Sequence, residues 1–174
     1  MNTIFIKLTT NLLTKITVKI LLLIASLFSS ASLAWVDLVM VDKSDNKMYL
    51  LSSGKVIKEY HVALGKNPEG HKEQEGDKRT PEGFYTLDYK KEDSAFYRAM
   101  HISYPNQFDL DNAEQKGVSA GGLIMIHGQR NNFEGLARYT QKSNWTNGCI
   151  ALTNPEIDEF MALVEVGTQI HIKW

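Results

Sequence analysis

The sequence predicts a mainly β domain, either a β-sandwich or a partly closed barrel, with a few short helices. Three observations lead to this fold class. Several short segments are rich in β-branched and aromatic residues and alternate between apolar and polar side chains, as half-buried strands do. Clusters of Gly, Asn, Asp and Ser separate these segments and are typical of turns. The segments with helical spacing are few and short.

The expected strands follow one another closely along the chain. The apolar run 123–126 is consistent with a strand that is buried on both faces. The last segment alternates Ile170, Ile172 and Trp174 with polar residues, which indicates a half-buried strand. In chain order, we expect strands at residues 38–42, 47–51, 56–64, 84–89, 96–104, 123–126, 150–152 and 170–174.

Helices and irregular segments fill the remaining stretches. Short helices are expected at 109–116 and 131–142, and a third begins where Asn154 can cap it ahead of Pro155. Residues 65–80 carry glycines, a proline and many charges. A connection of that length without regular structure is usually a functional lid or a mobile loop.

The amino-terminal segment is typical of an export signal. It carries three lysines and no acidic residue, then an apolar run and a stretch of small residues that ends at Ala34. We therefore expect residues 1–34 to be a signal peptide, with an uncleaved membrane anchor as the alternative. Residues 35–174 then form one domain, since single domains commonly run about 100–150 residues. No stable membrane insertion is expected after cleavage.

Charge excludes one class of partner. Removal of the three signal lysines leaves 16 basic residues against 20 acidic ones, a net charge of about −4. The chain contains no basic run and no stripe of alternating aromatic and basic residues. Nucleic acid is therefore not an expected partner.

Cys149 is the single cysteine of the chain, which is unusual for an exported protein because disulfides persist in oxidising compartments. Such a thiol is either inert in the core, paired with another chain, or chemically active. A thiol acts as a nucleophile once a base or cation is near it. Gly148 precedes the cysteine, so the Gly148 and Cys149 N–H groups can bind an oxyanion. The Thr146 hydroxyl is positioned in sequence to orient a catalytic imidazole.

Five histidines could serve as the base. His127 follows a buried apolar strand and precedes a glycine, which is where a rigid strand end delivers a side chain to a loop. His61 and His171 fit sheet positions, His71 fits a solvated loop position, and a supporting role is open to His101. A zinc site is disfavoured because the chain lacks a local Cys-x-x-Cys pair. A papain-like protease is disfavoured because there the cysteine precedes the histidine.

The segment Ile126-His127-Gly128, followed by Thr146-Asn147-Gly148-Cys149-Ile150, resembles the signature of the L,D-transpeptidase (YkuD) catalytic domain. Ala63-Leu64-Gly65 and Thr80-Pro81-Glu82-Gly83 are similar to further landmarks of that family. The resemblance extends over roughly residues 36–172 and is nearest to the short periplasmic branch of Gram-negative bacteria. It implies the fold of that domain and a location in the periplasm.

The resemblance also implies a reaction. Cys149 would attack a carbonyl of a peptidoglycan stem peptide and form a thioester, with His127 as the base. An amine acceptor would give a cross-link, or attachment of a wall-anchored lipoprotein, and thus a role in cell wall biogenesis and cell shape. Water would make the protein a hydrolase. The resemblance implies no metal and no organic cofactor. Outside enzymes, a catalytically silent wall-binding module and a dimer linked through Cys149 remain alternatives.

Two positions depart from the family pattern. Many members carry a histidine where this chain has Asn147, and an arginine where it has Ala151. Loss of that arginine removes a bidentate partner for a substrate carboxylate. Asn147, Arg79 and Arg138 are therefore the candidates for binding substrate.

Overall fold

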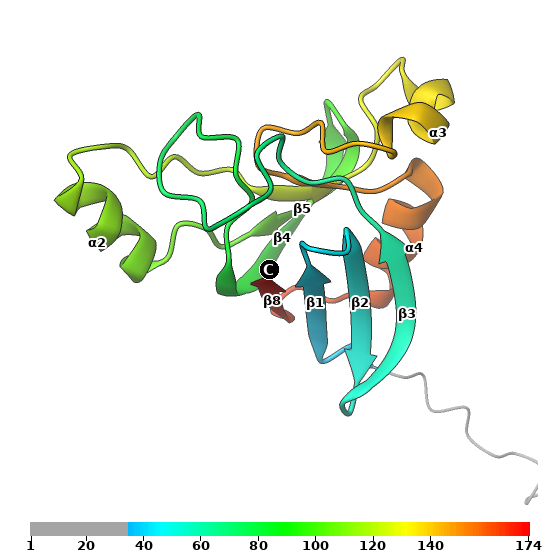
Figure 1. The fold of residues 1–174 in the computed structure, drawn as a ribbon. Coiled ribbons are helices and arrows are strands. Elements are labelled where there is room, and N and C mark those ends of the chain that lie inside the picture. The colour runs from blue at the N-terminus through cyan, green and yellow to red at the C-terminus, as the bar shows by residue number, and fades with distance from the viewer. Residues whose placement is uncertain (1–34) are drawn as a thin grey trace, which may run out of the picture. The chain divides into compact units, whose positions relative to one another are not determined.

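Residues 35–174 are the part of the chain that the computed structural model describes, and they form an eight-stranded mixed sheet flanked by short helices (Figure 1). The signal peptide expected at residues 1–34 lies outside the described residues. The strand order is β3-β2-β1-β8-β4-β5-β6-β7. The strands are β1 Leu38–Asp42, β2 Lys47–Ser52, β3 Lys55–His61, β4 Gly83–Ser94, β5 Tyr97–Ile102, β6 Met125–His127, β7 Ile150–Ala151 and β8 Gln169–Lys173.

β4 joins the two halves of the sheet. Its first residues, from Gly83 to Thr86, pair with β8, and the rest of the strand pairs with β5 through two register shifts. This strand is longer than the expected 84–89 because its charged second half still finds backbone partners on β5. The mainly β fold class is confirmed.

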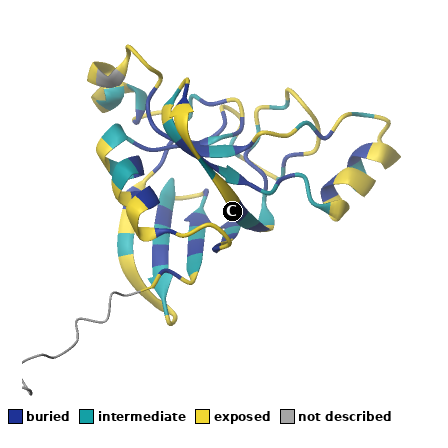
Figure 2. Ribbon diagram, turned by 180° about the vertical axis from the view of Figure 1, so that it is seen from behind, coloured by how far each residue is buried: buried dark blue, intermediate teal, exposed yellow. Residues whose placement is uncertain are grey.

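Every second residue of the central strands faces the hydrophobic core. Val39 of β1 pairs with Leu50 of β2 on one side and with Ile170 of β8 on the other. All three side chains are buried, whereas their neighbours along each strand are more exposed. Figure 2 shows dark blue and teal bands alternating along strands of the sheet. The period of two that the sequence displays is therefore the period of burial in the sheet.

Two of the expected helices are present. α2 spans Gln107–Gln115, close to the predicted 109–116, and α4 spans Asn154–Leu163. The prediction that Asn154 caps α4 was wrong, because Thr153 is the cap residue and Asn154 begins the helix. The Asn154 carboxamide oxygen instead accepts a hydrogen bond from the Gln129 N–H at 2.8 Å. α4 buries Ile157, Phe160 and Met161 in the core.

The helix expected at 131–142 is only partly present. This stretch contains a 3-10 turn, η1 Glu134–Leu136, and one α-helical turn, α3 Ala137–Thr140. Phe133 and Leu136 are 47% and 45% exposed, so the apolar positions that suggested a core-facing helix point to solvent. With so little burial, a longer helix has little tertiary packing to stabilise it.

β6 and β7 are short parallel neighbours, with Ile126 paired to Ile150 and His127 to Ala151. The strand expected at 123–126 begins two residues later, because Leu123 is 73% exposed and adopts a φ of 53°. Among residues 35–174, no helix is long and apolar enough to span a bilayer.

Candidate active site

The parallel pairing of β6 and β7 brings Cys149 and His127 to one face of the sheet. Cys149 immediately precedes Ile150, whose partner on β6 is Ile126, so Cys149 lies opposite Met125. Residues two apart on a strand point to the same face, and His127 is two residues after Met125. All three line one cavity of about 290 Å³. The other lining residues are Lys66, Ser94, Phe96, Ala99, Leu123, Trp145, Thr146 and Asn147.

His127 is buried and neutral. Its Nδ1 lies 2.7 Å from the Gly128 carbonyl oxygen, which can only accept, so Nδ1 carries the proton and Nε2 is left as the acceptor. Burial lowers the pKa of His127 to about 4, although the bond to Gly128 acts in the opposite direction. The imidazole lies between aromatic rings, with centroids 4.6 Å from Phe96 and 5.7 Å from Trp145. It is therefore a base from neutral pH down to about pH 4.

Cys149 is held as a neutral thiol. Its Sγ lies 3.8 Å from the Leu123 carbonyl oxygen, which accepts the weak S–H hydrogen bond. Burial raises the pKa of the thiol, and a Met125 backbone hydrogen bond and the charge of Lys72 oppose this effect. The side chain is only partly covered, so a ligand in the cavity can reach the sulfur. The site thus contains a neutral thiol and a neutral imidazole.

The turn before Cys149 is organised by Thr146, in a way that differs from the sequence prediction. The Thr146 hydroxyl donates to the Cys149 carbonyl oxygen at 2.7 Å and accepts from the Gly148 N–H at 3.1 Å. It therefore fixes the nucleophile's backbone rather than orienting the imidazole. The Gly148 N–H is not free for an oxyanion, and the Cys149 N–H is the donor that this turn can still offer.

Close backbone contacts place this turn against residues 65–79. A Cβ on Gly148 would lie 2.7 Å from the Arg79 carbonyl oxygen, and one on Gly65 would lie 2.1 Å from that of Lys78. Gly65 forms a parallel β-bridge with Thr146, whose N–H also donates to Leu64 at 3.1 Å. Gly65 and Gly148 are glycines because two backbones meet where a side chain would stand.

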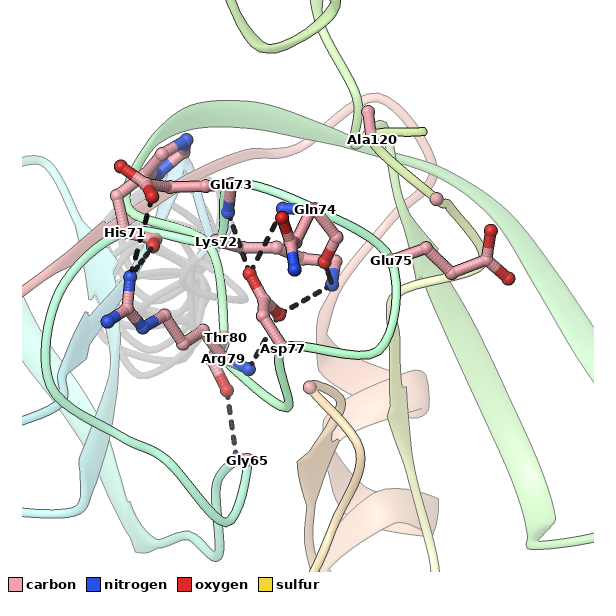
Figure 3. A network of polar contacts seen from close by, with 12 residues as sticks. Gly65, His71, Lys72, Glu73, Gln74, Glu75, Asp77, Arg79, Thr80 and Ala120 are labelled. Atoms are coloured by element: carbon pink, nitrogen blue, oxygen red, sulfur yellow. Dashed lines mark hydrogen bonds and ion pairs between the residues drawn. The ribbon is translucent and has the colours of Figure 1, made fainter. Parts of the chain in front are cut away.

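Residues 65–82, which we term the polar loop, are held in place by buried charges (Figure 3). Lys72 donates to the Asp77 carboxylate and to the Gln74 carbonyl oxygen, both at 2.9 Å. The same carboxylate accepts backbone N–H groups of Glu73, Gln74 and Arg79. Burial alone would raise the pKa of Asp77, but these hydrogen bonds lower it overall.

Two more side chains, Lys43 and His71, join the polar loop to the rest of the domain. The buried ammonium of Lys43 donates to Gly70 and Thr80 carbonyl oxygens at 2.7 and 2.9 Å and to Glu82 at 2.8 Å. His71 accepts the Glu82 N–H on Nδ1 at 3.0 Å and contacts buried Asp109 of α2 through Nε2 at 3.0 Å. The prediction of a solvated His71 was therefore wrong, because a partner 38 positions away in sequence covers it.

On the other side of the site, buried amides connect residues 129–145, which we term the insertion, to β7. Gln129 Nε2 donates to the Leu152 carbonyl oxygen at 2.8 Å and contacts Gln141 Oε1 at 3.2 Å. Gln141 Nε2 donates to Ala151, and Gln141 Oε1 accepts the Trp145 indole N–H at 3.4 Å. This network sets the position of Trp145, which forms one wall of the cavity beside His127.

The predicted substrate-binding residues are placed differently from one another. Asn147 is exposed and lines the cavity of Cys149. Arg79 lies outside that cavity, with NH1 3.4 Å from the His71 carbonyl oxygen and 3.8 Å from Glu73. Arg138 is exposed on α3 and lies over the Tyr139 ring, 4.7 Å from its centroid. Neither arginine lines the cavity of the cysteine.

Among the cavity residues that sequence reasoning missed are Lys66, Phe96 and Trp145. Trp145 stands next to the Thr-Asn-Gly-Cys segment, which was a usable signal, but nothing local marks Lys66 or Phe96. Within residues 35–174, no group of three or more His, Cys, Asp or Glu side chains could hold a metal ion. The arrangement suits acyl transfer through a thiol, because a nucleophile and an unprotonated base share one largely apolar cavity.

Comparisons with known proteins agree on one family. The YkuD family model, described as the L,D-transpeptidase catalytic domain, matches residues 37–172. The L,D-transpeptidase homologue YafK of Escherichia coli strain K12 is 32% identical over 124 residues, which is 70% of this chain and 40% of YafK. The homologue YqjB of Bacillus subtilis strain 168 is 29% identical over 138 residues, 77% of this chain and 69% of YqjB.

Solved structures share the fold of this chain. The helical cell shape determining protein Pgp2 from Campylobacter jejuni superposes with a TM-score of 0.58 at 28% identity, over 79% of this chain and 47% of Pgp2. The chain thus spans less than half the length of YafK and of Pgp2.

Proposed function

Because the chain belongs to the L,D-transpeptidase catalytic domain family, we propose that it is an exported cysteine acyltransferase acting on peptidoglycan stem peptides. The observation that carries the proposal is the shared cavity of Cys149 and His127, in which a half-covered thiol lies on the same sheet face as an unprotonated imidazole. An inert core cysteine needs neither an open cavity nor a base beside it.

The first half of the reaction is acylation of the cysteine. The Cys149 sulfur attacks the carbonyl carbon of the penultimate residue of the stem peptide, and His127 Nε2 takes the thiol proton. The Cys149 N–H donates to the developing oxyanion. The imidazolium then gives its proton to the departing amine, so the terminal amino acid leaves with a neutral amino group and a thioester remains.

Proton transfer accompanies attack in this scheme. The raised pKa of Cys149 and the lowered pKa of His127 both disfavour a resting thiolate–imidazolium pair. The thiol therefore loses its proton only as the carbon–sulfur bond forms, and the S–H contact to Leu123 keeps the sulfur in place until then.

The second half of the reaction transfers the acyl group. An amine attacks the thioester, His127 accepts its proton, and the thiol is restored. A stem-peptide amine gives a cross-link, and the lysine of a wall-anchored lipoprotein gives an attachment. Since Pgp2 is a helical cell shape determining protein, we extend the proposal to a role in cell shape, exerted in the periplasm.

Hydrolysis is the second candidate function. Cys149 is partly exposed and the exposed, polar Asn147 lines the same cavity, so water can reach a thioester there. The same machinery would then cleave a wall cross-link or a lipoprotein attachment instead of forming one.

The test is turnover of a purified tetrapeptide muropeptide by residues 35–174, with product masses read by chromatography and mass spectrometry. Release of the terminal amino acid, lost in Cys149→Ala, supports the acyltransferase. Adding an excess of an amine acceptor then separates transfer from hydrolysis by the mass of the product. Binding of the muropeptide by the wild type and Cys149→Ala alike, with no product from either, would contradict both enzymatic readings and favour a silent wall-binding module.

A further inference from the structure

The cavity of Cys149 contains one formal charge. Among the described residues that line it, Lys66 is the only acidic or basic side chain, since His127 is neutral above about pH 4. Much of the wall is apolar, from Phe96, Leu123, Met125 and Trp145. A charge beside apolar walls interacts more strongly with a ligand charge than it would in open water.

The backbone of Lys66 is fixed beside the nucleophile's turn. Its N–H donates to the Thr146 carbonyl oxygen at 3.0 Å, directly after the β-bridge between Gly65 and Thr146. Because these contacts involve only main-chain atoms, they hold the Cα of Lys66 whatever its side chain is. The ammonium can still adjust to a ligand, because its stem is long and flexible.

The Lys66 ammonium has no protein partner among residues 35–174. The buried ammonium groups of Lys43 and Lys72 show the contrast, because each is bound to a carboxylate and to backbone carbonyl oxygens. Lys66 is exposed, and no ion pair or side-chain hydrogen bond is formed by its Nζ. An unpaired cation at the wall of an apolar cavity is the complement of an anionic ligand.

Among the described residues, no other cation lines this cavity: Lys72, whose charge acts on the thiol, lies outside it and is bound to Asp77 and to the Gln74 carbonyl oxygen. Ala151 is fully buried, and its backbone is bound to Ala63 and Gln141. Arg79 and Arg138 lie outside the cavity, against Glu73 and Tyr139. Asn147 offers a neutral donor at the same cavity and can share a carboxylate with Lys66.

We propose that Lys66 is a specificity-determining residue whose ammonium binds the free carboxylate next to the scissile bond of the donor peptide. This inference rests on the proposed function for the identity of the peptide, but carboxylate recognition itself needs no chemistry at Cys149. It makes the cavity selective for peptides that end in a carboxylate rather than in an amide or a further residue.

The test compares two synthetic tetrapeptides of the stem sequence that differ only in a terminal carboxylate or carboxamide. Binding of both is measured by calorimetry on the Cys149→Ala protein, so that no turnover is required. We expect roughly tenfold tighter binding of the carboxylate, falling as salt is raised. Lys66→Gln should bring the ratio close to one, Lys66→Arg should retain most of it, and Lys66→Glu should invert it.

Lys55→Ala, which removes an exposed lysine at the start of β3, is the matched control and should keep the tenfold ratio. Equal binding of the two peptides by the parent protein would overturn the inference, as would an unchanged ratio in Lys66→Gln. Failure of the proposed function is a different result, because it is the absence of product from protein that carries Cys149.

Discussion

The polar loop and the insertion flank the same cavity, and they are built in opposite ways. Figure 1 shows both at the same edge of the molecule, with the loop in green and α3 in yellow. The polar loop has no helix, yet it holds the buried ammonium groups of Lys43 and Lys72, and Lys72 is paired with the largely covered carboxylate of Asp77. The insertion has helical turns, yet Phe133, Leu136 and Tyr139 are exposed.

The comparison teaches that regular structure and fixed structure are separate properties. A loop is held wherever its charges are buried with partners, because an unpaired buried charge costs several kcal/mol. A helical turn that buries no side chain has little to stabilise it. Residues 65–80, for which a functional lid or a mobile loop is expected, are held beside the nucleophile by paired charges and close backbone contacts, and the insertion has fewer such contacts in its helical turns.

The largest expected effect comes from substituting a glycine in each region. Gly65→Ala forces a Cβ within 2.1 Å of a backbone oxygen, whereas Gly135→Ala meets no atom within 4 Å. We expect Gly65→Ala to lower the free energy of unfolding by about 5 kcal/mol, at the extreme for single substitutions, and Gly135→Ala to leave it nearly unchanged. Urea unfolding followed by circular dichroism measures both. Similar values for the two variants would contradict the claim that the polar loop is more tightly constrained than the insertion.

Asp77→Ala should have the next largest effect. It leaves the Lys72 ammonium without its carboxylate and three backbone N–H groups without an acceptor. We expect a loss of about 3–5 kcal/mol. Glu165→Ala, an exposed acid outside the loop, is the control. A loss below about 1 kcal/mol for Asp77→Ala would mean that the loop is not held by this pair.

His127, between the two regions, gives an expected pH dependence of stability. Its folded pKa of about 4 lies below the ordinary 6.5, so between these values the unfolded chain binds a proton that the folded chain does not. Stability is lost as pH falls from 6.5 to 4, by roughly 3 kcal/mol from this group. His127→Gln should remove that slope, while His171→Gln, half-buried and stacked on Phe84, should retain it. Urea midpoints at a series of pH values provide the measurement.

The smallest expected effect lies in the insertion. Phe133→Ser and Leu136→Ser replace exposed side chains and should change the free energy of unfolding by less than about 0.5 kcal/mol. In limited proteolysis, we expect the insertion to be cleaved faster than the polar loop. Preferential cleavage of residues 65–80 would show that the polar loop is held less firmly than the insertion.

Local patterns in the sequence predict the strands of the sheet and the pair of Cys149 and His127. They do not predict contacts between residues that are far apart in the sequence. Ile170 and Ile172 reveal their strand because burial in a sheet has a period of two. The sequence does not show that the Thr146 hydroxyl accepts a hydrogen bond from the Gly148 N–H, nor that His71 contacts Asp109. Lys66 enters the cavity only because Gly65 meets Thr146 across 81 positions of sequence. No short-range pattern contains such a contact.

The most direct test of the central claim is the mass of the intact protein after incubation with a carbapenem, an acylating β-lactam, followed by peptide mapping. Cys149 beside an unprotonated His127 predicts an adduct of one carbapenem on the peptide that contains Cys149. Cys149→Ala should show none, and His127→Gln should acylate far more slowly. A folded wild-type protein with a reduced thiol and no adduct would contradict the account.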